Sequence, residues 1–171
     1  MQHAQVQQLQ GSDNLVKSTY QLKDVDEKIT AKAMLKNRPI SLKYATEICR
    51  EIKGKPLEKA EKMLQDIIEM RRYLPLRKYH KKVPHRKGKA ISGQKAGRYP
   101  ITACKHFLEL LSYAKANAEN KGLDTEKLIV KHAFACQGYR RFSMQPKGRI
   151  AGKRRRKKST HIEVILQEVK A

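Results

Sequence analysis

The sequence predicts an α+β fold in which three helices pack on a small antiparallel sheet and a long β-hairpin protrudes from the body. Three segments place apolar residues at helical spacing. Two strand-like segments near the C-terminus, 128–136 and 160–168, pair most simply as an antiparallel hairpin. The residues between them, 137–159, contain ten Lys or Arg and no acid, and this insert is far longer than a hairpin turn requires.

The basic insert is either a flexible loop or a continuation of both strands into an arm. Symmetric folding of the hairpin places its tip near residues 146–149. At about 3.3 Å per residue, an arm of roughly twenty residues reaches at most about 60 Å. An arm this long and this basic does not bury itself against its own domain, so we expect it to bind an anionic partner.

The overall charge also indicates a polyanionic partner. The 171 residues suffice for one domain with a core, and they carry a net charge of +23 from 39 Lys and Arg against 16 Asp and Glu. Nucleic acid is the polyanion that best relieves the self-repulsion of such a chain. Residues 70–108 and 127–162 contain no acid, which predicts two anion-facing surfaces. The alternative is solvated charge on flexible loops, which is the usual meaning of a short basic run.

No pattern in the sequence predicts an enzyme, a metal site or a cofactor. Cys49, Cys104 and Cys136 are far apart, so we expect buried small apolar side chains rather than disulfide partners. There is no CxxC pair, no Walker loop and no pair of carboxylates in either basic block. The lack of a long apolar run and of a secretion signal predicts a protein of the reducing cytoplasm without a membrane segment.

The N-terminal part of the chain predicts a flexible, Gln-rich tail at 1–17, followed by a single domain at 18–171. Segment 29–36 is compatible with two structures. Its Ala, Lys and Met residues favour a helix, whereas Pro39 and the short length oppose one. Its alternation favours an edge strand with a basic outer face. The inward residues are then Ala31, Ala33 and Leu35, and the outward residues are Lys32, Met34 and Lys36.

The next two segments predict a helical hairpin. Ser41 is a suitable N-cap for a helix that ends at Gly54, and Pro56 suits the start of the second helix. The short link makes the two helices neighbours. The expected buried stripes are Leu42, Ala45, Ile48, Cys49 and Ile52 in the first helix and Leu57, Ala60, Leu64, Ile67 and Ile68 in the second.

Residues 71–98 predict an irregular basic loop that binds RNA. Eleven Lys or Arg alternate with tyrosines and histidines, and three Gly and two Pro prevent one regular element. Such a segment is poorly stable by itself. It becomes ordered when phosphates neutralise its charges and its rings stack on bases or sugars.

The longest helix is predicted from Pro100 to about Lys121, and Gly122 is its C-terminal stop. Its apolar stripe is Ala103, Phe107, Leu110, Leu111, Ala114 and Ala118. In the hairpin, alternation directs two rows toward the helices, namely Leu128, Val130, His132, Phe134 and Cys136, and Ile162, Val164 and Leu166. The opposite rows are expected to face solvent, with Lys131, Glu163 and Gln167.

Five stretches together resemble one known family. They are TAKAMLK at 30–36, IKGK at 52–55, GRYP at 97–100, NAENKGLD at 117–124 and THIEV at 160–164. Each motif alone is weakly specific, but their order and spacing together are specific. The chain resembles, over about residues 19–168, the family of ribosomal large-subunit protein twenty-two in its archaeal and eukaryotic form.

The resemblance implies three helices on a three-stranded antiparallel sheet, with 29–36 as the third strand. It implies a structural, non-enzymatic constituent of the cytoplasmic large ribosomal subunit. The implied partners are large-subunit rRNA, neighbouring subunit proteins and the nascent polypeptide, whose exit tunnel the hairpin tip would line. Near the tip the family often has a Pro-Arg-x-x-Gly-Arg run, whereas this sequence has Pro146-Lys147-Gly148-Arg149.

Two sets of contact residues are expected from the resemblance and the basic pattern. The rRNA-binding set is Lys32, Lys36, Arg38, Lys43, Arg77, Lys78, His80, Arg86, Lys95, Arg98, Lys153, Arg154, Arg155 and Arg156. The tunnel-tip set is Arg140, Arg141, Phe142, Met144, Lys147 and Arg149, within an extended arm at 137–159.

Two other functions are weighed against this one. A DNA-bending architectural protein with a β-arm inserts an apolar wedge at its tip, and Pro146 fits that role. An RNA-modifying enzyme or nuclease needs an acid–base or metal constellation, which the basic blocks lack. Competition between folded rRNA and duplex DNA separates the architectural protein from the ribosomal one.

Overall fold

The computed structural model describes residues 20–23, 25–80 and 82–169. The predicted tail at 1–17 lies outside these residues. The elements are β1 (Thr30–Arg38), α1 (Leu42–Ile52), α2 (Leu57–Ile68), β2 (Leu74–Pro75), β3 (Gly97–Arg98), α3 (Ile101–Asn120), a 3-10 turn (Thr125–Lys127), β4 (Leu128–Met144) and β5 (Arg154–Glu168). Within the described residues, every helix is too short or too polar to cross a bilayer.

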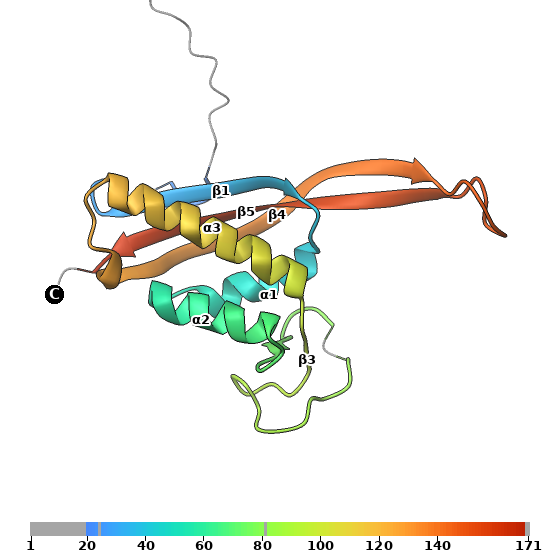
Figure 1. Cartoon of the computed structure of the whole chain (residues 1–171), viewed down its shortest axis with the longest axis horizontal. Helices are drawn as coiled ribbons and strands as arrows, with labels where there is room; N and C mark the ends of the chain where they lie inside the picture. Colours follow the sequence, from blue (N-terminus) through green and yellow to red (C-terminus); the bar gives the residue numbers. More distant parts are fainter. Residues whose placement is uncertain (1–19, 24, 81, 170–171) are drawn as a thin grey trace, which may run out of the picture.

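The predicted α+β architecture is confirmed. Strands β1, β5 and β4 form an antiparallel sheet in that order, and β2 and β3 form a separate short pair. The helices cover the sheet, while β4 and β5 continue together well beyond the helices as a long hairpin (Figure 1). Apolar side chains from all three helices and from the covered face of the sheet form one core.

Segment 30–38 is the edge strand that the alternation predicts. Ala31, Ala33 and Leu35 are buried, and Lys36 on the other face is exposed. The three buried residues each pair with a residue of β5, as Ala33 does with Val164. Pairing and burial therefore override the helix propensity of Ala, Lys and Met.

The helical hairpin and its link form as predicted. Ser41 occupies the N-cap of α1, although its side chain makes no capping hydrogen bond. Gly54 lies in the left-handed region at φ 79°, and its N–H donates to the carbonyl of Val130 at 2.7 Å. The N–H of Val130 in turn donates to the carbonyl of Lys55 at 2.9 Å. These two bonds fasten the link to β4.

Helix α3 ends where the sequence predicts. Gly122 has φ 72°, its N–H donates to Glu119, and the N–H of Leu123 donates to Ala118 at 3.1 Å. This pair of bonds satisfies the last carbonyls of the helix and needs a residue that tolerates positive φ. The predicted stripe is buried throughout, namely Ala103, Phe107, Leu110, Leu111, Ala114 and Ala118.

The predicted inner row of β4 is wrong beyond Val130. A bulge shifts the register between Val130 and His132, because Val130 pairs with Leu166 and His132 with Ile165. One extra residue in a strand turns all later side chains to the opposite face. Ala133 is therefore buried on the helix side, and Cys136 is exposed.

The expectation that all three cysteines are buried is therefore wrong for Cys136. Cys49 and Cys104 are buried, as predicted. Burial raises the pKa of Cys104 to about 12 and that of Cys49 even further, because a thiolate is poorly solvated in the core. These two thiols are chemically inert core residues.

The expectation that Glu163 faces solvent is also wrong. Glu163 is 5% exposed and the neighbouring Ile165 is 0% exposed, although both lie on the sheet face opposite to α3. The N–H of Gln21 donates to Glu163 Oε1 at 3.0 Å, which places the segment before β1 against this face. Lys131, in contrast, is exposed as expected.

The hairpin continues through the basic insert rather than opening into a flexible loop. Strand pairing extends from Leu128↔Glu168 at the base to Met144↔Arg154 at the far end. The remaining residues, 145–153, form the turn, which includes the predicted tip at 146–149. A second bulge lies between Gln137 and Arg140, close to the point where the hairpin leaves the body.

Candidate nucleic-acid interface

Two basic regions project from the core. The basic loop, residues 71–98, lies beside α1 and α2, and the arm, residues 137–159, extends away from the helices (Figure 1). No acidic residue occurs within either of them. Their anchoring to the body nevertheless differs.

The ends of the basic loop are held by buried apolar residues. Tyr73, Leu74, Leu76 and Ala96 are each 5% exposed or less. The Tyr73 hydroxyl donates to the carbonyl of Gln94 at 2.9 Å and so bridges the two ends. The Tyr73 ring fills the space beside Gly97, so a Cβ at this position would collide with the ring.

The middle of the loop is held by a carboxylate from another element. Glu47 of α1 is 1% exposed, and its Oε1 accepts the backbone N–H of Lys78 at 2.7 Å and of Tyr79 at 2.8 Å. Charge-assisted bonds of this kind are roughly twice as strong as neutral ones. The loop therefore has a defined path in its first half.

A second carboxylate one helical turn later holds the far half of the loop. Glu51 is 5% exposed, accepts from the Ser92 hydroxyl at 3.3 Å, and lies 3.4 Å from the Arg77 guanidinium. Neither acid was predicted from the sequence. The signal was available, since two glutamates four residues apart flank the apolar stripe of α1 and point the same way.

The predicted RNA-binding residues of the loop divide into exposed and internally bonded groups. Lys78, His80 and Lys95 are exposed. His80 stacks on Tyr44 of α1, with ring centroids 5.5 Å apart.

The three predicted RNA-binding arginines of the basic loop are half-buried and also form hydrogen bonds within the loop. Arg77 donates to Ser92 O at 2.9 Å, and Arg86 and Arg98 each donate to Gly97 O at 3.1 Å. Each guanidinium has five N–H groups, so donors are left for an outside acceptor.

Some of the predicted rRNA-binding residues on β1 and α1 form ion pairs with acidic residues of the same chain. Lys32 pairs with Glu27 at 3.0 Å, and Arg38 pairs with Glu109 of α3. A hydrogen bond from His106 and the charge of Arg38 hold the pKa of Glu109 below its ordinary value. Lys36 and Lys43 are exposed and form no ion pair with another described residue.

Lys43 lies close to the arm at the N-terminus of α1. A cavity of about 440 Å³ is bordered by Ser41, Lys43, Arg156 and Lys158. The first backbone N–H groups of a helix have no intrahelical acceptor and carry partial positive charge. The cavity thus combines helix N–H groups with three cationic side chains.

The arm carries positive charge on both faces. Residues directly opposite each other point the same way, so Arg140, Lys158, Phe142 and Arg156 share one face. The other face contains Arg141 opposite Lys157 and Ser143 opposite Arg155. Within the described residues, no ion pair involves any Lys or Arg of the arm.

Exposed apolar side chains interrupt this charge. Met144 is 69% exposed and Phe142 is 47% exposed, with the Arg154 guanidinium 3.7 Å from the Phe142 ring centroid. Tyr139 and Ile150, which were not among the predicted contact residues, are 73% and 47% exposed. Such side chains stack on bases or contact an apolar partner.

The predicted tip residues occupy two levels of the arm. Lys147 and Arg149 lie in the turn at 145–153, and Lys153 closes it. Met144 ends β4, whereas Arg140 and Arg141 lie further back on the paired strand. The turn itself therefore presents Lys147, Arg149 and Ile150.

A polar junction joins the arm to the body. Asn37, at φ 55°, accepts through Oδ1 from the N–H of Tyr139 at 3.1 Å and from the Ser159 hydroxyl at 3.2 Å. Its own N–H donates to His161 Nδ1 at 3.0 Å. Gly138 fits against this junction without a side chain, because a Cβ there would lie 2.6 Å from Asn37 Oδ1. The contacts define where the arm leaves the sheet.

Within the described residues, no group of three or more His, Cys, Asp or Glu is arranged to hold a metal ion. The arrangement instead offers cations and helix N–H groups, which bind phosphates, and exposed rings, which stack on bases.

Comparison with known proteins places this geometry in context. A profile described as "Ribosomal protein L22p/L17e" matches residues 33–167. The large ribosomal subunit protein uL22 of Methanocaldococcus jannaschii is 48% identical over 146 residues, which cover 84% of this chain and 91% of the relative. The uL22 proteins of Archaeoglobus fulgidus and Methanopyrus kandleri are 47% and 42% identical, over 72% and 85% of this chain and 79% and 91% of those proteins. All three are named as ribosomal proteins and none as an enzyme.

Proposed function

The chain belongs to the ribosomal protein L22p/L17e family, and from this premise we propose that it is a structural, non-enzymatic constituent of the cytoplasmic large ribosomal subunit that binds large-subunit rRNA. The membership confirms the resemblance drawn from the sequence. The observation that carries the proposal is the arm, a paired hairpin with ten Lys or Arg and no acidic partner among the described residues. A free surface of this kind repels itself until phosphates neutralise it.

The arm binds several RNA segments at once because its charge lies on both faces. The part of β4 that lies in the arm, residues 138–144, extends about 23 Å, at about 3.3 Å per residue, before the turn begins. A narrow two-stranded ribbon of this length fits between RNA helices rather than on one surface. Guanidinium groups fork onto phosphate oxygens and stack on bases, whereas Lys acts as a point charge.

The basic loop provides a second, preformed contact surface. Glu47 and Glu51 fix its backbone, so Lys78, His80 and Lys95 meet RNA with little further ordering. The cavity at the start of α1 provides a third contact, where Lys43, Arg156 and Lys158 bind one phosphate together with the helix N–H groups. Recognition at these surfaces depends on backbone and shape more than on sequence.

The tip of the arm lines the nascent-peptide exit tunnel. The exposed Met144, Lys147, Arg149 and Ile150 offer both apolar and cationic contacts to a passing polypeptide. Neighbouring subunit proteins contact the body, and rRNA surrounds the rest of the arm. The same proposal includes the remaining predicted contact residues. These are Lys32, Lys36, Arg38, Arg77, Arg86, Arg98, Lys153, Arg154, Arg155, Arg140, Arg141 and Phe142.

The dependence of rRNA binding on salt tests the proposal. Replacing Arg154, Arg155 and Arg156 by Gln removes three charges from the arm. The slope of log affinity against log salt is negative, and its magnitude should decrease by about 2 to 3. The matched control is Lys28, Lys59 and Lys62 replaced by Gln, since these exposed lysines lie outside both basic regions.

The proposal is contradicted if the two triple variants change the salt slope of binding to large-subunit rRNA by the same amount. A preference of the unsubstituted protein for duplex DNA over folded rRNA contradicts it as well. Sedimentation supplies an independent check, because the protein should travel with large subunits and leave them only at high salt.

A further inference from the structure

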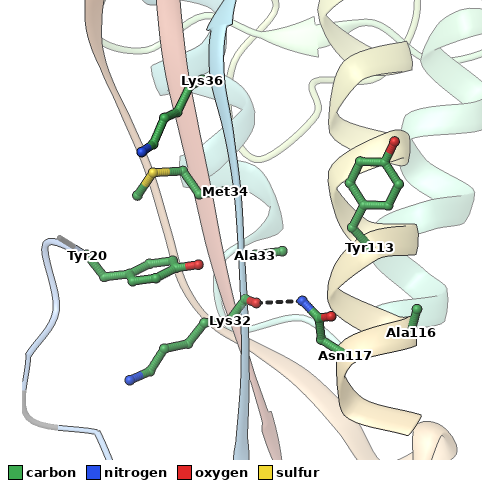
Figure 2. A pocket seen from close by; sticks show the side chains of 8 residues that line it. All are labelled: Tyr20, Lys32, Ala33, Met34, Lys36, Tyr113, Ala116 and Asn117. Carbon is green, nitrogen blue, oxygen red and sulfur yellow. Dashed lines mark hydrogen bonds between the residues drawn. The ribbon is translucent and has the colours of Figure 1, made fainter. Parts of the chain in front are cut away.

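A groove runs along the free edge of β1. It has a volume of about 640 Å³ and is lined from β1 by Lys32, Ala33, Met34 and Lys36, from α3 by Tyr113, Ala116 and Asn117, and from the preceding segment by Tyr20. Figure 2 shows the side chains of Lys32, Met34 and Lys36 on one side of the strand and those of α3 on the other. The strand edge itself lies between these two walls.

The backbone of this edge has unpaired hydrogen-bonding groups. Among the described strands, β1 pairs with β5 only, and in an antiparallel pair alternate residues direct their N–H and C=O away from the partner. The carbonyl of Ile29 accepts from Glu168, whereas that of Lys32 accepts from the Asn117 side chain at 2.9 Å. By this alternation, Lys32 and Met34 direct their backbone groups outward, and the pairing of β1 with β5 becomes irregular between Leu35 and Arg38.

One end of the edge is already closed by α3. Lys121 Nζ donates to the carbonyl of Thr30 at 2.9 Å, and Asn117 caps the carbonyl of Lys32. No such cap reaches the N–H and C=O of Met34 or Lys36 from the described residues. The open stretch therefore begins at Met34, in the middle of the groove.

We propose that this edge binds an extended polypeptide segment of a neighbouring large-subunit protein, which adds to β1 as a further strand. A polypeptide presents donors and acceptors in the same alternation as the edge, whereas a phosphate backbone only accepts. The inference rests on the proposed function, because the partner belongs to the same subunit. It identifies where one of the protein neighbours docks.

The walls of the groove specify the chemistry of that segment. On the side of α3, Ala116 is small and Tyr113 is 49% exposed, which suits an apolar side chain. On the other side, Lys36 is exposed and has no acidic partner among the described residues, which suits a carboxylate, so this inference assigns Lys36 to the protein neighbour in place of an rRNA phosphate. A second copy of this chain fits poorly, since antiparallel self-pairing brings lysines of two +23 chains together.

Photo-crosslinking tests this docking site. Benzoylphenylalanine at position 113 is expected to crosslink one other subunit protein in purified large subunits. Lys36→Glu reverses the selected charge, and Met34→Pro removes one outward N–H without touching a bond to β5. Each is expected to reduce the crosslink yield at least tenfold, while Met34→Leu leaves it unchanged.

Several results overturn the inference. These are a crosslink only to rRNA, a crosslink to residues 1–19 of the same chain, no crosslink, or a yield that neither Lys36→Glu nor Met34→Pro changes. Co-sedimentation with large subunits is measured in the same samples. If the unsubstituted protein does not co-sediment, the proposed function fails; if it co-sediments without the protein crosslink, only the docking inference fails.

Discussion

The basic loop at 71–98 and the arm at 137–159 are similar in sequence, since both are acid-free and rich in Lys and Arg, but they are held differently. The loop packs on α1, where Glu47 accepts two of its backbone N–H groups, and Glu51 accepts the Ser92 hydroxyl and pairs with Arg77. The arm meets no carboxylate within the described residues and is held by its own strand pairing and by the junction at Asn37. An acid-free stretch therefore says nothing about whether acids elsewhere in the chain neutralise it.

The difference suggests a division of labour in RNA binding. The loop is expected to lose little conformational entropy on binding, because its backbone is already held in one path. An isolated two-stranded hairpin is at best marginally stable in water, so we expect the arm to become rigid only on binding the RNA proposed above. Four predictions follow from this contrast, in order of decreasing effect.

Removal of the arm has the largest expected effect. Replacing residues 138–158 by an Asn-Gly turn should leave the free energy of unfolding within about 1 kcal/mol, because the removed side chains are almost all exposed. The salt slope of rRNA binding should fall by up to about 7 to 9, since ten cations are lost. Urea unfolding and filter binding measure the two quantities, and collapse of the shortened body would show that the arm belongs to the core.

Loss of a buried carboxylate should disturb the loop and spare the arm. Glu47→Ala leaves the N–H groups of Lys78 and Tyr79 without their acceptor, which should lower the free energy of unfolding by about 2 to 3 kcal/mol. The matched control is Glu58→Ala, because Glu58 is an exposed acid on α2. Equal stability of the two variants in urea would mean that the loop does not depend on α1.

A side chain at the junction should weaken the root of the arm. Gly138→Ala places a Cβ within 2.6 Å of Asn37 Oδ1 and 2.8 Å of Ser159 Oγ, which should cost about 1 to 2 kcal/mol. Ser143→Ala, further along the arm, is expected to change stability by less than about 0.5 kcal/mol. If both substitutions are neutral in chemical denaturation, the junction does not hold the arm.

Thiol reactivity should distinguish the hairpin from the core. Cys136 is exposed, so one thiol per native molecule should react with an aromatic disulfide reagent. Cys49 and Cys104 should react only in denaturant, because burial raises the pKa of both thiols. Mass spectrometry counts the modified residues, and labelling of Cys104 in the native protein would contradict the described core.

Local patterns predicted most of the fold. The spacing of apolar residues, Gly54 and Gly122 located the three helices, and alternation in 30–36 identified the edge strand. The bulge after Val130 was not predicted, because an extra residue in a strand has no local signature and reverses every later side chain. This is why Phe134 and Cys136 were assigned to the wrong face.

Long-range contacts explain the other differences. Glu163 was expected in solvent, but Gln21, more than a hundred residues away in sequence, covers it. The charge pattern located the basic loop and the arm, yet it did not show that α1 supplies the acids beneath the loop. Residue types gave the chemistry of the interface, whereas only the tertiary structure showed which cations already have partners.

Amide hydrogen exchange on the free protein tests the contrast between the two regions most directly. We expect the N–H groups of Lys78 and Tyr79, which donate to Glu47, to exchange at least about tenfold more slowly than those of 140–158. In assembled large subunits both regions should be protected. Strong protection across 140–158 in the free protein would contradict the account, because the arm would then be rigid before any RNA is bound.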